Sequence, residues 1–191
     1  MQKAQEILEF WIDGVGPQGW YAVNDAVDQE ISEKFKDDWE QAANGAYCDW
    51  RVYPEKALAL IILLDQMPRN MFRDDKRAFA TDKLARCAAR YAIEAKFDKR
   101  TPEPLRQFFY LPLMHSESLS DQERCVRLVK SRMPETGART LPHARAHREL
   151  IRRFGRFPYR NAVLGRKNTA EETVFLSENG YQQTLAEFLA A

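Results

Sequence analysis

The apolar positions along the chain recur with the period of helices rather than strands. Between Asn24 and Asn44, four of them are spaced four residues apart and share one helix face: Val27, Ile31, Phe35 and Trp39. Residues 55–66 are apolar around most of a helical circumference, which predicts a central, buried helix. No stretch alternates apolar and polar residues as a half-buried strand would. The pattern predicts an all-α fold: a single-domain, antiparallel array of helices joined by short connectors.

Short polar motifs mark several expected helix starts. Ser120 and Thr169 each begin a capping box. In this motif the hydroxyl accepts a hydrogen bond from the backbone N–H three residues later, and the glutamate at that position accepts one from the N–H of the capping residue. Thr81 is expected to cap a further helix with its side chain. These motifs predict helices that begin directly after Ser120, Thr169 and Thr81.

Prolines mark other expected helix ends. We expect Pro54 and Pro142 to begin helices, because proline is favoured at the first helical position. Pro68 is expected to end the helix over residues 55–66, because proline disfavours helical backbone at the residue before it. A short helix is expected over residues 104–110.

The composition fits one soluble domain over residues 1–191. Hydrophobic residues make up 45% of the chain and charged residues 30%, as in globular proteins, and 191 residues are enough to bury a core. The longest apolar run, Ala57 to Leu64, is far shorter than the roughly 18 residues of a membrane span. Residues 1–10 lack the apolar stretch of a signal peptide. We therefore expect no membrane association.

The three cysteines indicate a reducing compartment. Cys48, Cys87 and Cys125 are odd in number, widely separated and without the spacing of a metal site. Cys87 is expected on a buried helix face with Leu84 and Tyr91. We expect a cytoplasmic protein without disulfides, and we predict no cofactor.

Charge is segregated along the chain although the net charge is only +1. Residues 1–50 carry eleven acidic and three basic side chains, a net −8, whereas residues 139–167 carry nine basic and one acidic, a net +8. The basic segment could attract phosphates or acidic partners, or it could pair with acidic residues of the same fold. The sequence leaves both explanations open.

Three polar stretches, residues 64–73, 108–117 and 152–166, are the best places for a functional site, because function concentrates on connectors between rigid elements. Arginine forks match carboxylate and phosphate groups, and the third stretch ends just before a helix start, where free N–H groups favour anions. Equally, these arginines could form structural ion pairs. The side chains expected to bind a ligand are Arg69, Asn70, Arg73, Ser116, His147, Arg156, Tyr159, Arg160, Asn161 and Arg166.

His115 is the residue of these stretches that can exchange protons near pH 7. The catalytic set predicted around it is His115, Glu117 and Asp65, in which a carboxylate would hold the imidazole ring. Ser116 lacks the glycine elbow that flanks the nucleophile of many serine hydrolases, so the sequence disfavours that class.

A pair of histidines raises a minor metal hypothesis. His143 and His147 stand four residues apart, as metal ligands on a helix do, but Ala144 takes the place of the glutamate of zinc proteases. Two nitrogens and one carboxylate, from His115, His147 and Glu117, could still converge on zinc. Against this hypothesis, our prediction is that no metal is bound.

Together these motifs resemble the bacterial family called domain of unknown function 924. The similarity extends over nearly the whole chain and depends on motifs in a fixed order: Ile7 to Trp11, Leu63 to Asn70, Phe79 to Asp82, Phe109 to Pro112, His115 to Glu117, His147, Arg153 to Pro158, Arg160 to Asn161, Leu164 to Arg166, Thr169 and Glu172. The resemblance implies an all-helical fold similar to tetratricopeptide-repeat arrays, and it implies no activity. The family pattern has histidine where this chain has Tyr159, a poor proton shuttle at pH 7 because the ordinary tyrosine pKa is about 10.

These observations lead to three functional hypotheses. The first is a pocket for a small anionic ligand, formed where six side chains meet: Asp65, Arg69, His115, Glu117, Arg156 and Arg160. The alternative is a protein–protein interaction module in which the same residues form a buried structural network. A second alternative is RNA binding through residues 139–167, although the near-neutral net charge makes nucleic acid the weaker partner. The sequence assigns no reaction, so it does not decide whether the protein is an enzyme.

Overall fold

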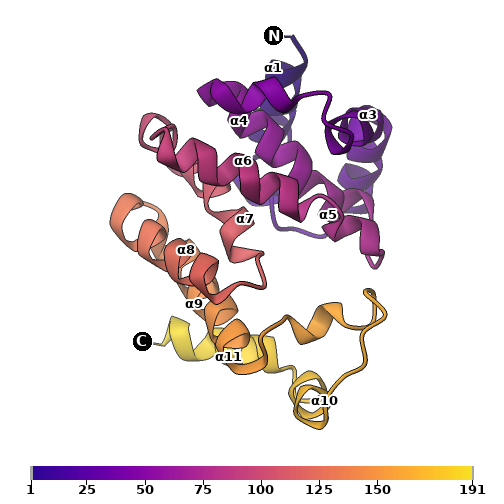
Figure 1. Ribbon diagram of the computed structural model, residues 1–191, viewed down its shortest axis with the longest axis vertical. Coiled ribbons are helices and arrows are strands. Elements are labelled where there is room, and N and C mark those ends of the chain that lie inside the picture. Colours follow the sequence, from indigo (N-terminus) through magenta and orange to yellow (C-terminus); the bar gives the residue numbers. More distant parts are fainter. Residues whose placement is uncertain (1, 191) are drawn as a thin grey trace. The chain divides into compact units, whose positions relative to one another are not determined.

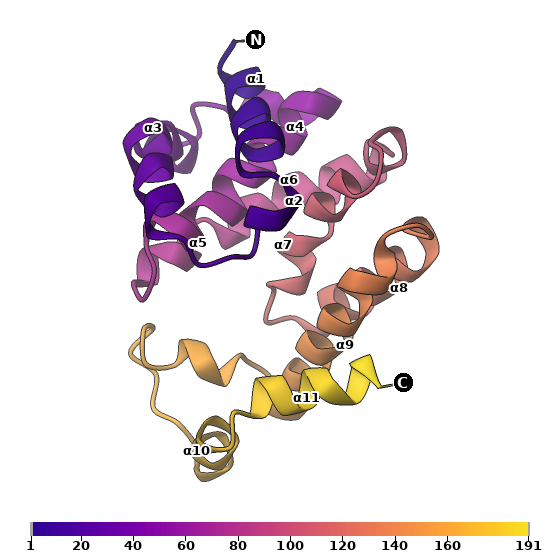
Figure 2. The ribbon, with the colours of Figure 1, turned by 180° about the vertical axis from the view of Figure 1, so that it is seen from behind.

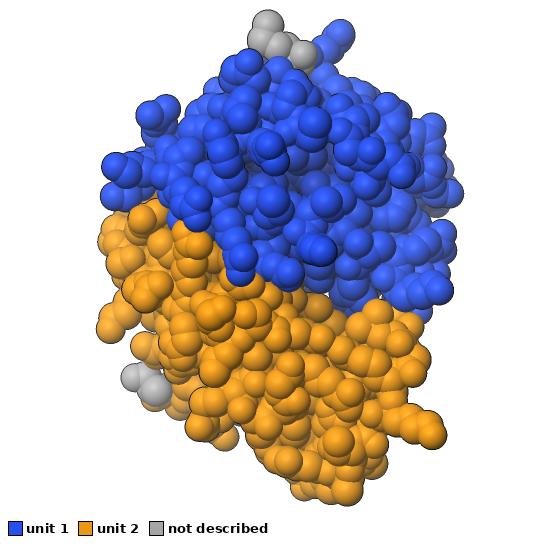
Figure 3. All heavy atoms as spheres, in the orientation of Figure 1, with its two compact units in different colours: residues 1–100 blue, residues 101–191 orange. Residues whose placement is uncertain are grey.

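The computed structural model describes residues 2–190, and within them the backbone forms helices and turns but no strand. The all-α prediction is confirmed. The chain divides into two compact units, residues 1–100 (unit 1) and residues 101–191 (unit 2), which Figure 3 colours separately. Each unit is described by itself.

Unit 1 is built around helix α4, which packs against α1 and α6, while α3 packs against α5 (Figure 1). Five consecutive residues of α4, from Ala57 to Ile61, are buried, as the run of apolar residues predicts for a central helix. Asn24 caps α3, because its side-chain oxygen accepts hydrogen bonds from the N–H groups of Ala26 and Val27. The helices of unit 1 are α1 (Gln2–Glu9), α2 (Gly16–Gly19), α3 (Asp25–Ala43), α4 (Pro54–Ile61), α5 (Met67–Met71) and α6 (Asp82–Glu94).

The central helix does not end at Pro68, so that prediction is wrong. After α4 the chain makes a π-helical turn, η3 (Ile62–Gln66), in which the Met67 N–H bonds to the Ile62 carbonyl five residues back. The helical path then continues into α5 with Pro68 in its first turn. Proline offers no N–H to the Leu64 carbonyl four residues earlier, and that carbonyl accepts a hydrogen bond from a side-chain hydroxyl instead. Pro54 begins α4 as expected.

Helix α6 turns a different face to the core than the sequence suggests. Its buried side consists mainly of alanines, at positions Ala85, Ala88, Ala89 and Ala92. Cys87 is exposed and Leu84 and Tyr91 are 42% and 40% exposed, so the prediction that Cys87 lies on a buried face is wrong. Small side chains let α6 approach α4 closely, which favours the alanine stripe over the larger residues.

Thr81 precedes α6 but does not cap it with its side chain, contrary to expectation. Its hydroxyl donates to the carbonyl of Leu64 at 2.6 Å and accepts from the indole N–H of Trp39 at 3.0 Å. Thr81 therefore ties α3, the π-helical turn and the start of α6 together.

In unit 2, helix α9 packs against both α8 and α11 (Figure 2). A core of Leu150, Ile151, Phe157 and Phe175 lies where α9, the following connector and α10 meet. The expected short helix over residues 104–110 is present as a 3-10 helix, Leu105–Phe109. The helices of unit 2 are α7 (Leu111–Met114), α8 (Leu119–Arg132), α9 (Gly137–Phe154), α10 (Ala170–Ser177) and α11 (Gly180–Leu189).

The helix starts of unit 2 match the sequence only in part. Thr169 forms the predicted capping box at α10: its hydroxyl accepts from Glu172 N at 3.1 Å, and Thr169 N donates to the Glu172 carboxylate at 2.7 Å. The box expected at Ser120 is absent, because α8 already begins at Leu119 with Ser118 before it. Pro142 lies inside α9 rather than at its start.

Helix α9 starts earlier than expected because a distant carboxylate holds its first turn. Glu103 Oε2 accepts hydrogen bonds from Thr136 N at 2.7 Å, from the Thr136 hydroxyl at 2.8 Å and from Glu135 N at 3.2 Å. The carboxylate thereby satisfies N–H and O–H donors just before the first helical residues, which would otherwise lack acceptors.

Candidate functional site

The predicted site residues of unit 1 form a paired cluster at the π-helical turn and α5, which we call the Arg69 cluster: Asp28, Asp65, Arg69, Asn70, Arg73 and Asp82. Arg69 donates to the Asp65 carbonyl at 2.6 Å and to the Asp82 carboxylate at 2.9 Å. Its guanidinium also lies 3.6 Å from the fully buried Asp65 carboxylate. Arg69 therefore joins the π-helical turn to the start of α6.

Asp28, on α3, supports the other two polar residues of this cluster. Arg73 donates to both oxygens of its carboxylate, with Nη2 at 2.9 Å from Oδ1, and Asn70 donates to Oδ1 at 2.7 Å. The side chains of Arg69, Asn70 and Arg73 are therefore all bonded to carboxylates inside unit 1. An anionic ligand at these residues would have to compete with those carboxylates.

In unit 2, Glu117 receives two sets of hydrogen bonds from the connector after α9. The guanidinium of Arg166 binds both its oxygens, at 2.8 and 2.9 Å, and the backbone N–H of Phe157 donates to it at 2.9 Å. Burial raises the pKa of Glu117, but the bonds from Arg166 and Phe157 outweigh burial and lower the pKa overall. Glu117 is thus an ionised anchor for this connector: the donors to its carboxylate are Arg166 and the Phe157 N–H, and none from the His115 ring is found among residues 2–190.

Arg156 and Glu172 form a second pair in unit 2. Arg156 binds both oxygens of Glu172, at 2.6 and 2.7 Å, and also donates to the carbonyl of Lys167 at 2.9 Å. The Arg156 bond is the largest cause that lowers the pKa of Glu172 to about 2. Asn161 is fully buried nearby and donates to Asn168 at 2.7 Å. These bonds fix the connector onto the start of α10.

His147, on α9, makes one side-chain hydrogen bond. Its Nδ1 lies 2.8 Å from the carbonyl oxygen of His143, one turn earlier on α9. Because a carbonyl only accepts, Nδ1 carries the proton and Nε2 is left as an acceptor. No hydrogen bond to Nε2 is found among residues 2–190.

Rings surround His147 and define what we call the His147 cluster: His115, His147, Phe157, Tyr159, Arg160 and Tyr181. The ring centroids of Phe157 and Tyr181 are each 5.3 Å from that of His147, and the His115 ring is at 6.4 Å. Burial, followed by the electrostatic interaction with His115, lowers the pKa of His147 to about 3. His147 is therefore neutral at pH 7.

Arg160 connects the remaining predicted residues of unit 2. Its side chain is 6% exposed, its guanidinium lies 4.4 Å from the centre of the Phe157 ring, and Nη1 donates to the His115 carbonyl at 3.1 Å. Ser116 donates to the Asp121 carboxylate at 2.8 Å. A carboxylate rather than a histidine thus accepts the proton of this serine, which is unlike a hydrolase nucleophile.

Comparison with known proteins places this architecture. A family model described as "Bacterial protein of unknown function (DUF924)" matches residues 7–180. The chain belongs to this family. A solved structure described as a protein of unknown function, ATU0120 from Agrobacterium tumefaciens, is 40% identical in sequence, with a TM-score of 0.86 over 93% of this chain and 98% of that one. No curated protein matches the chain.

In this DUF924 member Tyr159 belongs to an aromatic stack. Its ring lies 5.4 Å from Phe157 in a stacked arrangement and 6.1 Å from Tyr181 edge-on. The side chain is 40% exposed, so it forms the outer edge of the His147 cluster.

The metal hypothesis does not fit this DUF924 fold. Among residues 2–190, no group of three or more histidine, cysteine, aspartate or glutamate side chains is placed to hold a metal ion. Glu117, the carboxylate of the hypothetical set, is bonded to Arg166 and Phe157 instead.

Among residues 2–190, no helix is both long enough and apolar enough to cross a membrane.

Most of the basic segment is neutralised inside unit 2. Five of its nine basic residues form ion pairs with glutamates of the same unit: Arg148 with Glu123, Arg152 with Glu149, Arg153 with Glu171, Arg156 with Glu172 and Arg166 with Glu117. These pairs favour the intramolecular explanation of the segregated charge over attraction of RNA.

The predicted residues fall into two groups. Asp65, Arg69, Asn70 and Arg73 belong to unit 1, and the others belong to unit 2. Three partners were missed by sequence reasoning: Asp28, Tyr181 and Asp121. Asp28 lies in the first turn of α3 and Tyr181 on α11, far along the chain from the residues they contact, so no local motif identifies them. That all the residues share one hollow stays a prediction.

Proposed function

We propose that the protein binds a small anionic ligand that also carries a hydroxyl group, and that the His147 cluster is the binding site. The observation that carries the proposal is the hydrogen bond of His147 Nδ1 to the His143 carbonyl, which leaves Nε2 as an acceptor on a ring that Phe157 and Tyr181 flank. A hydroxyl of the ligand would donate to this nitrogen.

The charges near His147 support the anionic part of the proposal. Arg160 is the permanently charged group whose charge acts on the His147 ring. A site beside a fixed positive charge concentrates ligands of negative charge. Arg160 supplies a forked donor suited to a carboxylate or phosphate.

The other arginines predicted to bind a ligand are not part of the proposed site. Arg69, Arg73, Arg156 and Arg166 each bond to a carboxylate of their own unit, so their contribution is to hold the fold in which the cluster forms. The site is expected to take a compact molecule, since aromatic side chains enclose it on several sides.

A paired screen tests the proposal. Thermal-shift titrations would compare glycolate with acetate, malate with succinate, and glycerol 3-phosphate with inorganic phosphate. We expect the hydroxylated member of at least one pair to raise Tm more, because only it donates to Nε2, and binding to the native state alone raises Tm with concentration. The ring signals of His147 in NMR spectra would shift in the same titration.

Two variants complete this test. His147→Ala removes the acceptor and is expected to abolish the difference within a pair, while Arg152→Gln, which removes an exposed charge paired with Glu149, is expected to retain it. If no compound changes Tm or the His147 signals, the ligand proposal fails.

The second candidate function is a protein-interaction module whose polar motifs are structural. The observation in its favour is that the motif arginines are already paired, as a buried network requires. Tetratricopeptide-repeat-like stacking of the helices would then present a binding face to another protein. A negative result in every ligand titration would favour this candidate over the first.

A further inference from the structure

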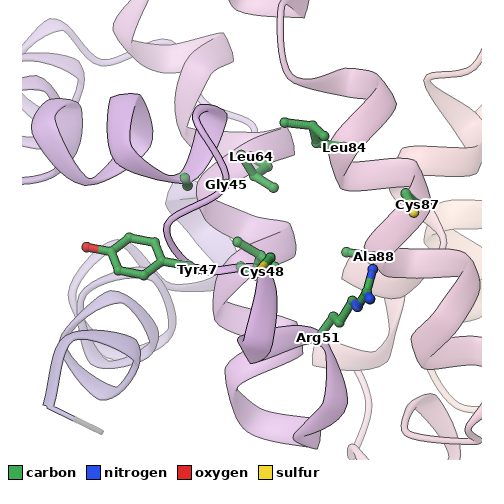
Figure 4. A pocket seen from close by; sticks show the side chains of 10 residues that line it. Gly45, Tyr47, Cys48, Arg51, Leu64, Leu84, Cys87 and Ala88 are labelled. Carbon is green, nitrogen blue, oxygen red and sulfur yellow. The ribbon is translucent and has the colours of Figure 1, made fainter.

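A hollow in unit 1 is lined by none of the residues that form the two polar clusters (Figure 4). Its volume is about 100 Å³, and it opens to solvent. Its walls come from the end of α3 and the connector after it, the 3-10 turn η2 (Cys48–Val52), α4, the π-helical turn η3 and α6. Apolar side chains form most of them: Ala42, Leu60, Leu64, Leu84 and Ala88.

Arg51 is the one lining residue that is charged at pH 7. Within residues 2–190 its guanidinium forms no ion pair, and it lies 5.9 Å from the centre of the Tyr91 ring. Figure 4 shows the guanidinium directed towards α6, beside Ala88. The hydroxyl of Tyr47 points away from the hollow and donates to Asp38 at 2.8 Å.

Two thiols line the same hollow from different elements. Cys48 belongs to η2 and Cys87 to α6, and both are exposed. Cys125 of unit 2 is buried. Any molecule that fills the hollow would cover both exposed thiols and leave Cys125 as it is.

We infer that the hollow is a binding site for a small monocarboxylate with a compact hydrocarbon body. The carboxylate would pair with the Arg51 fork, which has no acidic partner, and the hydrocarbon would cover the leucines of the wall. A cationic ligand would meet only Arg51 as a charge, and a strongly polar one would find few partners on the leucine and alanine walls. This site is independent of the His147 cluster, which lies in the other unit.

The exposed thiols provide the test. The full-length protein would be treated with iodoacetamide in the presence of 4-phenylbutyrate, and the modified peptides would be quantified by mass spectrometry. Modification of Cys48 and Cys87 is expected to slow as the acid is added, with Cys125 unmodified as a sign that the protein stays folded. The uncharged 4-phenylbutyramide is expected to need a concentration at least roughly tenfold higher for the same protection, because it lacks the charged partner for Arg51.

A matched pair of variants shows whether Arg51 is responsible. Arg51→Gln is expected to weaken protection by the acid roughly tenfold and to leave protection by the amide unchanged. Arg100→Gln removes another exposed arginine of unit 1, one outside the hollow, and is expected to behave as the wild type. The inference is overturned if the acid protects neither thiol or only one at about 10 mM, well above the affinity expected for such a site. It is also overturned if acid and amide protect equally, or if Arg51→Gln has no effect.

Discussion

Glu117 and His147 lie in the same unit but are held in opposite states of ionisation. Hydrogen bonds from Arg166 and from the Phe157 N–H keep the Glu117 carboxylate charged, whereas burial and basic neighbours keep the His147 imidazole neutral. The sequence identified both residues but not this difference. The difference depends on Arg166, 49 residues from Glu117 along the chain, which local sequence patterns cannot reveal.

The neutral state of His147 has a consequence for stability. In the unfolded chain its pKa returns to about 6.5, so between pH 6.5 and about 3 the unfolded state binds more protons than the folded one. The free energy of unfolding is therefore expected to fall as the pH falls through this window. Urea unfolding of the wild type and of His147→Gln at pH 7, 6, 5 and 4 would measure it.

The variant should lose part of the pH dependence. Gln does not titrate, so its free energy of unfolding should decline less steeply between pH 6.5 and pH 4 than that of the wild type. The groups nearest to the ring, His115, His143, Arg160 and Tyr181, are present in both proteins and cancel in the comparison. Parallel curves for the two proteins would contradict the assignment.

At the scale of elements, helix starts differ in how far along the chain the residues that cap them lie. The capping box of α10 lies within four residues, from Thr169 to Glu172, and could be predicted. The start of α9 could not, because its Glu103 acceptor is 33 residues from Thr136 along the chain. Likewise, no local pattern indicates that Asp28 would bond to Arg73, 45 residues away. Local patterns thus predicted the helical class and several boundaries, and they missed the partners that hold the site residues.

Glu103 should therefore matter for α9 more than its position in a turn suggests. Its side chain is 4% exposed, and hydrogen bonds to a charged acceptor contribute roughly 1.5–3 kcal/mol. We expect Glu103→Ala to lower the free energy of unfolding by about 2–3 kcal/mol, a fall in Tm of roughly 4–12 °C for a chain of this size. Glu123→Ala, at a 54% exposed position, should change it by less than about 1 kcal/mol. Equal effects of the two substitutions would show that Glu103 does not hold the helix.

For the whole molecule, the prediction of a single domain can be tested against its two compact units. All four tryptophans lie in unit 1, whereas helices occur in both units. Tryptophan fluorescence therefore reports on unit 1 alone, and far-ultraviolet circular dichroism reports on the whole chain. If residues 1–191 unfold as one domain, the two signals should change at the same urea concentration. Separated midpoints would mean that each unit unfolds on its own.

The π-helical turn before α5 has a consequence for how this chain tolerates change in length. Such a turn holds one residue more than a regular helix, and that additional residue rotates every later side chain about the helix axis. Deleting any one residue of 62–66 would straighten the path, carry Arg69 away from Asp82 and set the Pro68 ring against a carbonyl of the preceding turn. Substitutions in this segment are therefore more easily accommodated than a single deletion.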